Sequence, residues 1–171
     1  MEAAGSKFPR ALDAECRIAV LIPCFNESRT IAAVVEAFRS QLPDAEIFVC
    51  DNNSTDTTVQ EARRSGAHVC FENRQGKGAA VRRLFSDVEA DLYLLVDGDM
   101  TYDAPSAAAL VDALWTRRLD MVNAARRTID DAAYRPGHRF GNKLLTTLVQ
   151  VIFGRRFNDM LSGYRVFSRR V

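Results

Sequence analysis

Two acidic residues, Asp97 and Asp99, stand at the end of an apolar stretch and are separated by a single glycine. The five residues before them, Leu-Tyr-Leu-Leu-Val at 92–96, predict a buried strand. Residues i and i+2 of an extended chain share a face, so both carboxylates would project the same way. Two carboxylates this close need a nearby cation, or one of them must hold a proton. Mg²⁺ and Mn²⁺ prefer oxygen ligands, so the pair predicts a divalent-cation site, with a polar strand end facing water as the simpler alternative.

The elements that would position this pair are strands alternating with helices. Apolar periodicity and turn residues predict strands at 17–23, 46–50, 67–71, 91–96 and 120–125, and helices at 31–42, 56–65, 77–88 and 105–117. Such alternation is typical of βαβ units and a mostly parallel, Rossmann-like sheet. Ligands of such sheets bind beyond the carboxyl ends of the strands. This rule groups residues 23–27, 51–54, 73–78 and 97–101 along one rim. The segment SGYRVFSRRV at 162–171 begins like a further strand.

Charge is distributed unevenly along a chain of 171 residues whose net charge is +1. Residues 1–113 contain 11 Lys and Arg against 18 Asp and Glu, whereas residues 114–171 contain 12 against 4. The basic final part suggests contact with an anionic partner, the alternative being a solvated basic surface. A nucleic acid is disfavoured, because no recognised binding motif accompanies the basic residues.

The cysteines and the apolar stretches argue against a zinc site, a signal peptide and a membrane-spanning helix. The four cysteines show no C-x-x-C spacing, which disfavours zinc and favours a reducing, cytosolic setting. No signal peptide is visible, and no apolar stretch reaches the roughly 18 residues that a membrane helix needs.

One other enzyme class competes for the acidic motif, and a second segment resembles a P-loop without being one. The segment DGDMT fits the D-x-D-x-T signature of haloacid-dehalogenase-like phosphatases, but 96 residues with βαβ units of their own precede it. The segment QGKGAAV is not a P-loop, because Phe71 and Gly78 stand where that motif needs Gly and Ser or Thr. Lys77 and the backbone around it could still meet a phosphate, or simply begin a helix. In the polar turn after residue 50, Asp51 could accept hydrogen bonds from a nucleobase.

Four segments taken together resemble the family 2 inverting glycosyltransferases of the GT-A fold. They are LIPCFNES, VCDNNSTDTT, NRQGKGAAV and LLVDGDMTYDAP, in that family's order and spacing. The resemblance runs from about residue 17 to the end. It implies one α/β domain of three layers, with a mostly parallel central sheet, incomplete at the C-terminus. Residues 1–16 would be an arm, 17–125 the nucleotide-sugar-binding half and 126–171 the acceptor-side half.

The final third resembles the polyprenyl-phosphate (dolichol-phosphate-type) branch, which moves a sugar from a nucleotide donor to a lipid phosphate. The segments that carry this likeness are DMVNAARR, YRPGHRFGNKLL and FNDMLSGYRVFSRR. The resemblance implies a GDP- or UDP-sugar donor, Mg²⁺ or Mn²⁺, and a lipid-phosphate acceptor at the cytoplasmic face of a membrane, where the protein would be peripheral. The sequence does not predict the oligomeric state.

The resemblance also implies residue roles. The donor nucleotide sugar would contact Pro23, Phe25, Glu27, Asp51, Lys77, Asp97 and Gly98. The metal would be bound by Asp97, Asp99 and Thr101. The acceptor phosphate would be held by Arg126, Arg135 and Arg139, and the catalytic residues would be Asp97, Asp99 and Asp159.

One departure from the family pattern lies within the turn after residue 50, where Asn52 replaces the second acid of a common D-D-G-S turn. Two alternative functions stay open. One is a family 2 transferase with a sugar hydroxyl acceptor, for which Asp159 would be the candidate base. The other is an inactive fragment that binds a nucleotide sugar.

Overall fold

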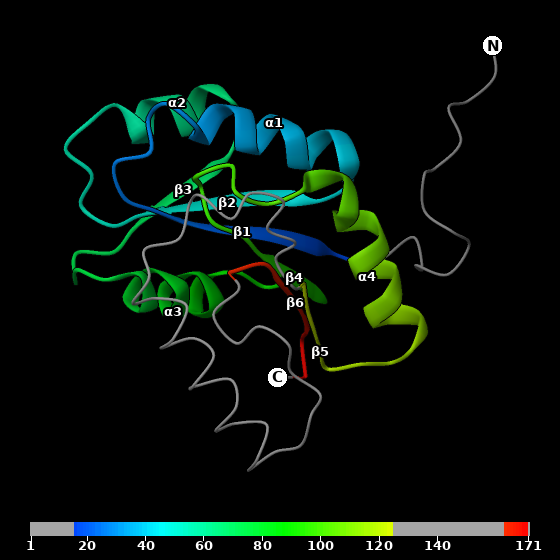
Figure 1. The fold of residues 1–171 in the computed structure, drawn as a ribbon. Helices are drawn as coiled ribbons and strands as arrows, with labels where there is room; N and C mark the ends of the chain where they lie inside the picture. The colour runs from blue at the N-terminus through cyan, green and yellow to red at the C-terminus, as the bar shows by residue number, and fades with distance from the viewer. Residues whose placement is uncertain (1–15, 125–162, 171) are drawn as a thin grey trace, which may run out of the picture.

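The computed structural model describes residues 16–124 and 163–170, which share one six-stranded sheet in the order β3-β2-β1-β4-β6-β5 (Figure 1). The strands are β1 (Ile18–Cys24), β2 (Glu46–Asp51), β3 (His68–Phe71), β4 (Leu92–Leu95), β5 (Met121–Asn123) and β6 (Arg165–Ser168). The helices are α1 (Ile31–Gln41), α2 (Thr58–Arg64), α3 (Lys77–Asp87) and α4 (Ala107–Thr116), the last preceded by a 3-10 turn at Ala104–Ser106.

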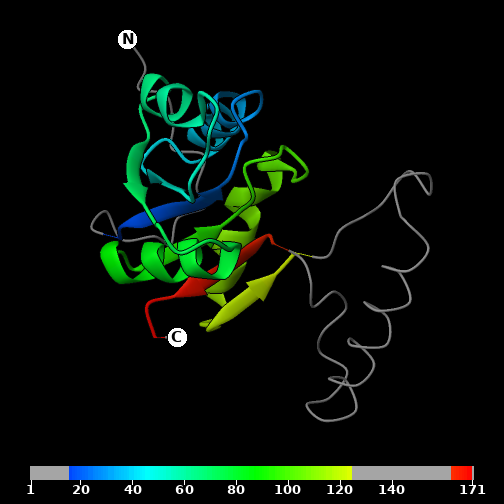
Figure 2. The same cartoon turned by 90° about the vertical axis from the view of Figure 1, so that its left-hand side faces the viewer.

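The first four strands run parallel, with β1 at the centre between β2 and β4. β6 lies antiparallel to β4 on one side and to β5 on the other, so it separates two strands that precede it in the chain. Figure 2 shows β5 and β6 side by side at this edge. The carboxyl ends of β1, β2 and β4 therefore meet at one rim.

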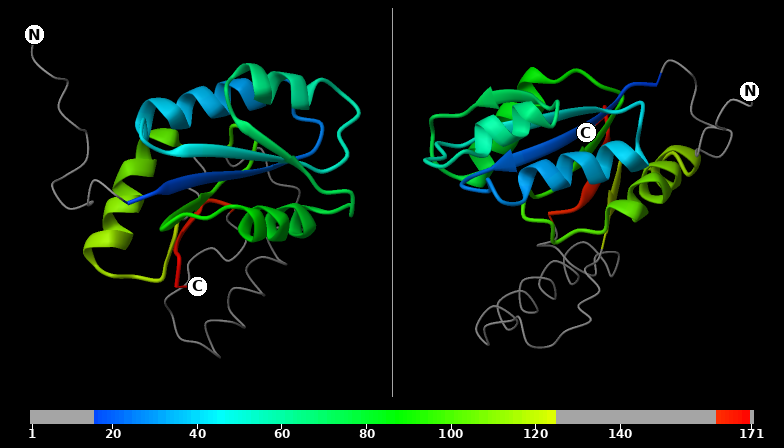
Figure 3. Two further views of the ribbon diagram at one scale, coloured as in Figure 1. Left: turned by 180° about the vertical axis from the view of Figure 1, so that it is seen from behind. Right: turned by 90° about the horizontal axis from the view of Figure 1, so that it is seen from above.

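Helices cover both faces of the sheet, which explains why β1 and β4 are apolar throughout instead of alternating. Buried side chains of α1, α2 and α4 pack with Val20, Ile22 and Leu94 on one face. α3 packs with Leu21 and Leu95 on the other face. Figure 1 shows α1 and α3 on opposite sides of the sheet, and the view from above in Figure 3 shows α1 lying over β1 with α2 beside it.

The structure confirms the predicted three-layer α/β architecture and its mostly parallel sheet. Each predicted strand and helix within the described residues is present, with ends shifted by a few residues. The insertion of β6 between β4 and β5 was not predicted. The division between residues 125 and 126 stays a prediction, because residues 125–162 lie outside the described part. Among the described helices, none is long and apolar enough to cross a bilayer.

Candidate functional site

A cavity of about 270 Å³ opens at the carboxyl ends of the central strands. Its walls come from the segments that follow β1, β2, β3 and β4, which the sequence grouped along one rim. The lining residues are Pro23, Cys24, Phe25, Glu27, Asn52, Gln75, Gly76, Lys77, Ala80, Asp97 and Asp99. Six of the predicted donor and metal residues thus line one cavity: Pro23, Phe25, Glu27, Lys77, Asp97 and Asp99. The predicted residues Gly98 and Thr101 are not among its lining residues.

Lys77 brings a positive charge into this cavity at the first residue of α3. Its ammonium forms an ion pair with Oδ1 of Asp97. The preceding Gly76 has φ 124°, a conformation that favours glycine, and this turn directs the chain into α3. The side chain of Lys77 is 54% exposed and that of Asp97 is 19% exposed, so the pair sits at the wall between solvent and protein.

Glu27 lies against Gly98, between the two aspartates, and its surroundings shift the pKa of its carboxyl group. Burial raises the pKa of Glu27, and the neighbouring carboxylates of Asp99 and Asp97 raise it further, while the Cys24 thiol and the Lys77 ammonium oppose this shift. Oε2 of Glu27 is buried and accepts no hydrogen bond from the described residues that meets normal geometry. Burial and the two nearby aspartates therefore favour the neutral form of the Glu27 carboxyl group.

Close packing explains the glycine between the two acids. A methyl group at Gly98 would overlap Oε2 of Glu27 and lie 2.8 Å from Sγ of Cys24. The Gly98 carbonyl accepts a hydrogen bond of 2.7 Å from Oγ1 of Thr30, a residue that the sequence interpretation did not single out. Gly98 therefore has a packing role beneath the site.

Asp99 and Thr101 are directly linked. Oδ1 of Asp99 accepts hydrogen bonds from the backbone N–H of Thr101 at 3.1 Å and from its hydroxyl at 2.6 Å. Met100 between them has φ 60°, which folds the segment into this local turn. The Thr101 hydroxyl thus holds the Asp99 carboxylate in place.

Asn52 has a role that the sequence interpretation missed. Its side-chain amide donates hydrogen bonds to the carbonyls of Glu72 and Arg74, and its Oδ1 accepts one of 2.7 Å from Gly76 N–H. A carboxylate could not donate the first two bonds. Asn52 thus holds the loop that leads into Lys77, which gives a physical reason for its departure from the family pattern.

The loops after β1 and β2 are tied together by side chains. Oγ1 of Thr58 accepts a hydrogen bond of 2.8 Å from Glu27 N–H, and Oδ2 of Asp56 accepts one of 3.2 Å from Ser28 N–H. Hydrogen bonds that the Asp56 carboxylate accepts from the Thr58 hydroxyl, from Thr58 N–H and from Ser28 lower the pKa of Asp56 to about 2. The backbone that carries Glu27 is therefore fixed by residues about 30 positions later in the chain.

Asp51 lies at the end of β2 and is buried, but it does not line the cavity. Its Oδ2 accepts a hydrogen bond from Ser54 N–H, while Oδ1 has no hydrogen-bond partner among the described residues. The predicted acceptor-side residues Arg126, Arg135, Arg139 and Asp159 lie outside the described residues.

The oxygen chemistry of the cavity suits a hard divalent cation. Asp97 and Asp99 both line it, and Oδ1 of Asp97 is buried with no hydrogen bond of normal geometry among the described residues, although Lys77 pairs with it electrostatically. Within residues 16–124 and 163–170, no group of three or more His, Cys, Asp or Glu side chains is arranged as a metal site. The two aspartates fit a cation that takes its other ligands from water or a bound anion.

Several known proteins are similar to this chain. It is 52% identical over 123 residues to protein RfbJ of Shigella flexneri, covering 71% of this chain and 95% of that protein. It is 39% identical over 163 residues to glycosyltransferase AglJ of Haloferax volcanii, covering 92% of this chain and 51% of AglJ. A dolichyl-phosphate hexose transferase of the same organism is 25% identical, with 90% of this chain and 67% of that protein covered.

A solved structure has the same fold. Glucosyl-3-phosphoglycerate synthase from Mycobacterium tuberculosis, in complex with Mn²⁺, UDP-glucose and phosphoglyceric acid, superposes with a TM-score of 0.74 at 26% identity. The match covers 92% of this chain and 58% of the synthase. The chain thus spans about half the length of AglJ and somewhat more of the synthase.

The family model described as glycosyl transferase family 2 matches residues 19–171. This range includes every segment that lines the cavity. The D-x-D-x-T segment thus belongs to a transferase and not to a phosphatase. The chain belongs to glycosyl transferase family 2.

Proposed function

We propose that this chain transfers a hexose from a nucleoside diphosphate sugar to a polyprenyl phosphate, by a metal-assisted displacement that inverts the anomeric centre. The observation that carries the proposal is the cavity in which Lys77, Asp97 and Asp99 converge. A cation and two carboxylates on one wall suit a ligand that brings both phosphate oxygens and a divalent metal ion.

The donor would lie across the rim. The ring of Phe25 is 48% exposed at the mouth of the cavity, beside Pro23, and offers an apolar surface to the nucleoside. Glu27 and Asp51 would accept hydrogen bonds from the ribose and the base, and the backbone of Gly98 would contact the donor. The Lys77 ammonium would contact the diphosphate, where a charge-assisted bond is strong.

Asp97 and Asp99 would hold the cation, with Thr101 contributing directly or by orienting Asp99. Mg²⁺ or Mn²⁺ bound there would neutralise charge that develops on the departing nucleoside diphosphate. Lys77 would add a second positive charge near the same phosphates. Together these groups make the nucleotide a better leaving group.

The acceptor proposal rests on the basic final part of the sequence and on the similarity to a dolichyl-phosphate hexose transferase. A phosphate acceptor is already anionic at neutral pH, so positioning matters more than removal of a proton. Arg126, Arg135 and Arg139 would position it through paired N–H donors, and Asp159 would shape the acceptor side. The protein would then act at a membrane surface.

The test is a transfer assay with UDP-[¹⁴C]glucose or GDP-[¹⁴C]mannose, Mn²⁺ and three acceptors in parallel: a short polyprenyl phosphate, 3-phosphoglycerate and a free sugar. Label should move to the organic phase with the lipid acceptor and should stay in water when EDTA is added. Asp99→Asn should lower the rate by more than about 100-fold, since residues that merely support metal ligands already account for 10–100-fold.

Asp103→Asn is the matched control, because it makes the same chemical change four residues later, where the side chain forms no capping hydrogen bond. It should keep nearly full activity. Label in 3-phosphoglycerate or in the free sugar, with none in the lipid, would replace the proposed acceptor. Equal rates for wild type and Asp99→Asn would exclude the proposed metal role.

A further inference from the structure

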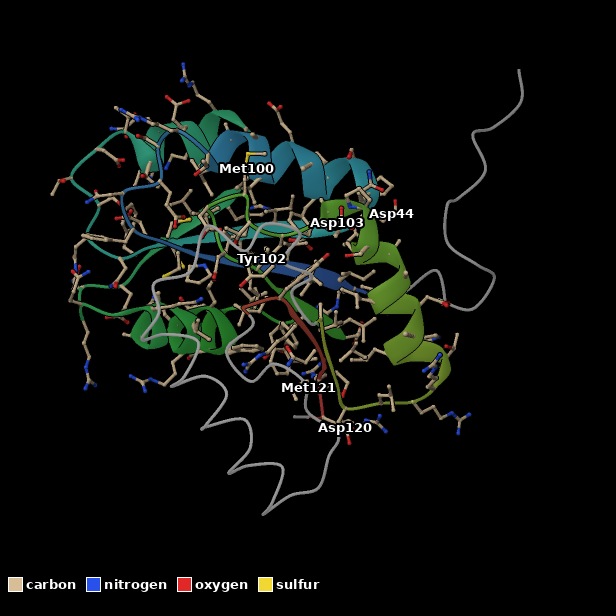
Figure 4. The ribbon with its side chains drawn as sticks, viewed as in Figure 1. Asp44, Met100, Tyr102, Asp103, Asp120 and Met121 are labelled. Atoms are coloured by element: carbon tan, nitrogen blue, oxygen red, sulfur yellow. The ribbon has the colours of Figure 1, made fainter. Side chains whose placement is uncertain are left out.

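The phenol of Tyr102 lies between the acidic pair and a segment some 60 residues further along the chain. Its hydroxyl oxygen accepts a hydrogen bond of 2.7 Å from the backbone N–H of Gly163 and lies 3.4 Å from Oδ2 of Asp97. Tyr102 does not line the cavity. It follows Met100 on the loop that leads to Asp103 and the 3-10 turn before α4 (Figure 4).

The direction of these bonds is determined by chemistry. An amide N–H can only donate, so the phenol oxygen of Tyr102 accepts the hydrogen bond from Gly163. The hydroxyl proton of Tyr102 can then be donated to a different acceptor. The Oδ2 atom of Asp97 is within reach of that proton. The contact is longer than the usual O–H···O range, which suits an orienting role better than a large share of stability.

The two oxygens of Asp97 are thereby given different surroundings. Oδ2 faces the Tyr102 phenol, whereas Oδ1 faces Lys77 at the wall of the cavity. The torsion that rotates a carboxylate is soft, so without a partner for Oδ2 the group could turn. The phenol therefore biases the rotation of the carboxylate plane, and with it the direction in which the other oxygen faces the cavity.

Gly163 is needed for space at this point. A methyl group there would lie 2.6 Å from Oδ2 of Asp97 and 2.8 Å from the Tyr102 oxygen. Both distances are shorter than real contacts of a methyl carbon, so any other residue would push the carboxylate or the phenol away. Gly163, two residues before β6, is thus packed directly against Asp97 and Tyr102.

The Tyr102 ring is held by aromatic packing. It contacts the ring of Tyr164 at a centroid distance of 5.4 Å, and Tyr164 in turn packs edge-on against Phe38 of α1 at 5.9 Å. The hydroxyl of Tyr164 donates a hydrogen bond of 3.3 Å to the carbonyl of Asp103. Tyr164 is buried, so the position of Tyr102 is coupled to the entry of β6.

We propose that Tyr102 is a positioning residue for the donor site. Its hydroxyl orients the Asp97 carboxylate and connects it to the backbone N–H of Gly163. The inference rests on the proposed function, because it assigns Asp97 to a divalent cation. It adds that the contact between Tyr102 and Gly163 controls how well Asp97 can bind that cation.

The test compares Tyr102→Phe with wild type in the full 171-residue chain, using Mn²⁺ alone and Mn²⁺ with UDP. Binding is followed by the loss of the free Mn²⁺ signal in electron paramagnetic resonance, and stability by thermal unfolding. We expect the affinity for Mn²⁺ to fall by about 10-fold, the lower end of the effect of residues that support metal ligands.

Tyr93→Phe is the control. The Tyr93 hydroxyl likewise both accepts and donates, accepting from Ala90 N–H and donating to the Val88 carbonyl, both at 3.1 Å, but Tyr93 is in β4 and does not line the cavity. It should lower the unfolding temperature without changing Mn²⁺ affinity. Gly163→Ala should weaken Mn²⁺ binding in the same direction as Tyr102→Phe.

The outcomes separate this inference from the proposed function. Wild type that binds no Mn²⁺, with or without UDP, would overturn the proposed metal role and the inference with it. Wild type that binds Mn²⁺, together with a Tyr102→Phe variant that binds equally well but unfolds earlier, would overturn the inference alone. A selective loss of affinity in Tyr102→Phe and Gly163→Ala would support it.

Discussion

Replacing Lys77 by methionine should change metal and nucleotide binding in opposite directions. In the structure the Lys77 ammonium pairs with Oδ1 of Asp97, the atom that the proposed function assigns to the cation. The ammonium and the metal ion therefore compete for one oxygen when no donor is present. With donor bound, the ammonium would instead contact the diphosphate. Lys77→Met should thus tighten Mn²⁺ binding without nucleotide and weaken UDP binding when Mn²⁺ is saturating.

The magnitude follows from the exposure of the pair. The lysine side chain is 54% exposed, so solvent screens the interaction, and such pairs contribute up to about 1 kcal/mol. Removing that competition should lower the Kd for Mn²⁺ by up to about fivefold. Loss of a charged hydrogen bond to phosphate costs about 1.5–3 kcal/mol, which corresponds to roughly tenfold or more in the Kd for UDP.

Isothermal titration at low ionic strength measures both constants, because salt would screen the effect on Mn²⁺. Arg83→Met is the matched control, since Arg83 is on the same helix and pairs with Asp87, away from the cavity. It should leave both constants unchanged. Mn²⁺ affinity that is equal or weaker in Lys77→Met would refute the competition between ammonium and metal ion.

Two further predictions concern the packing and the electrostatics beneath the site. Gly98→Ala should lower the free energy of unfolding by about 1–3 kcal/mol in urea titrations, because the added methyl group overlaps the Glu27 carboxylate and crowds Cys24; an unchanged urea midpoint would contradict the packing argument. Asp56 has a folded-state pKa of about 2, depressed from 3.8, so its contribution to stability is present above pH 4 and is lost as pH falls towards 2. Asp56→Asn should therefore reduce the loss of stability between pH 4 and pH 2, as followed by circular dichroism, and identical acid profiles for both proteins would exclude a role for this carboxylate.

The sequence was informative wherever the signal is local. Apolar runs and helical periodicity predicted the strands and helices from residue 17 to residue 124, because burial on both faces leaves a pattern within each segment. The rule that ligands bind at the carboxyl ends of parallel strands then brought Lys77, Asp97 and Asp99 to one rim, and the cavity confirms that these three residues converge.

Contacts between distant segments could not be predicted in the same way. The position of β6 between β4 and β5, and with it the approach of Gly163 to Tyr102, depends on pairing between strands that lie far apart in the sequence, such as Leu95 with Arg165. Likewise, the role of Asn52 becomes apparent only from its hydrogen bonds to two carbonyl groups of the loop before α3.

What the sequence by itself determined is the chemistry at the rim and the order of the elements, since residue types and short-range periodicity carry both. What only the tertiary structure decided is how each carboxylate is oriented: Oδ1 of Asp97 towards Lys77, Oδ2 towards Tyr102, and Asp99 towards Thr101. The physical reason is that orientation depends on hydrogen-bond geometry between side chains that strand register brings together, and no local pattern of residues encodes that register.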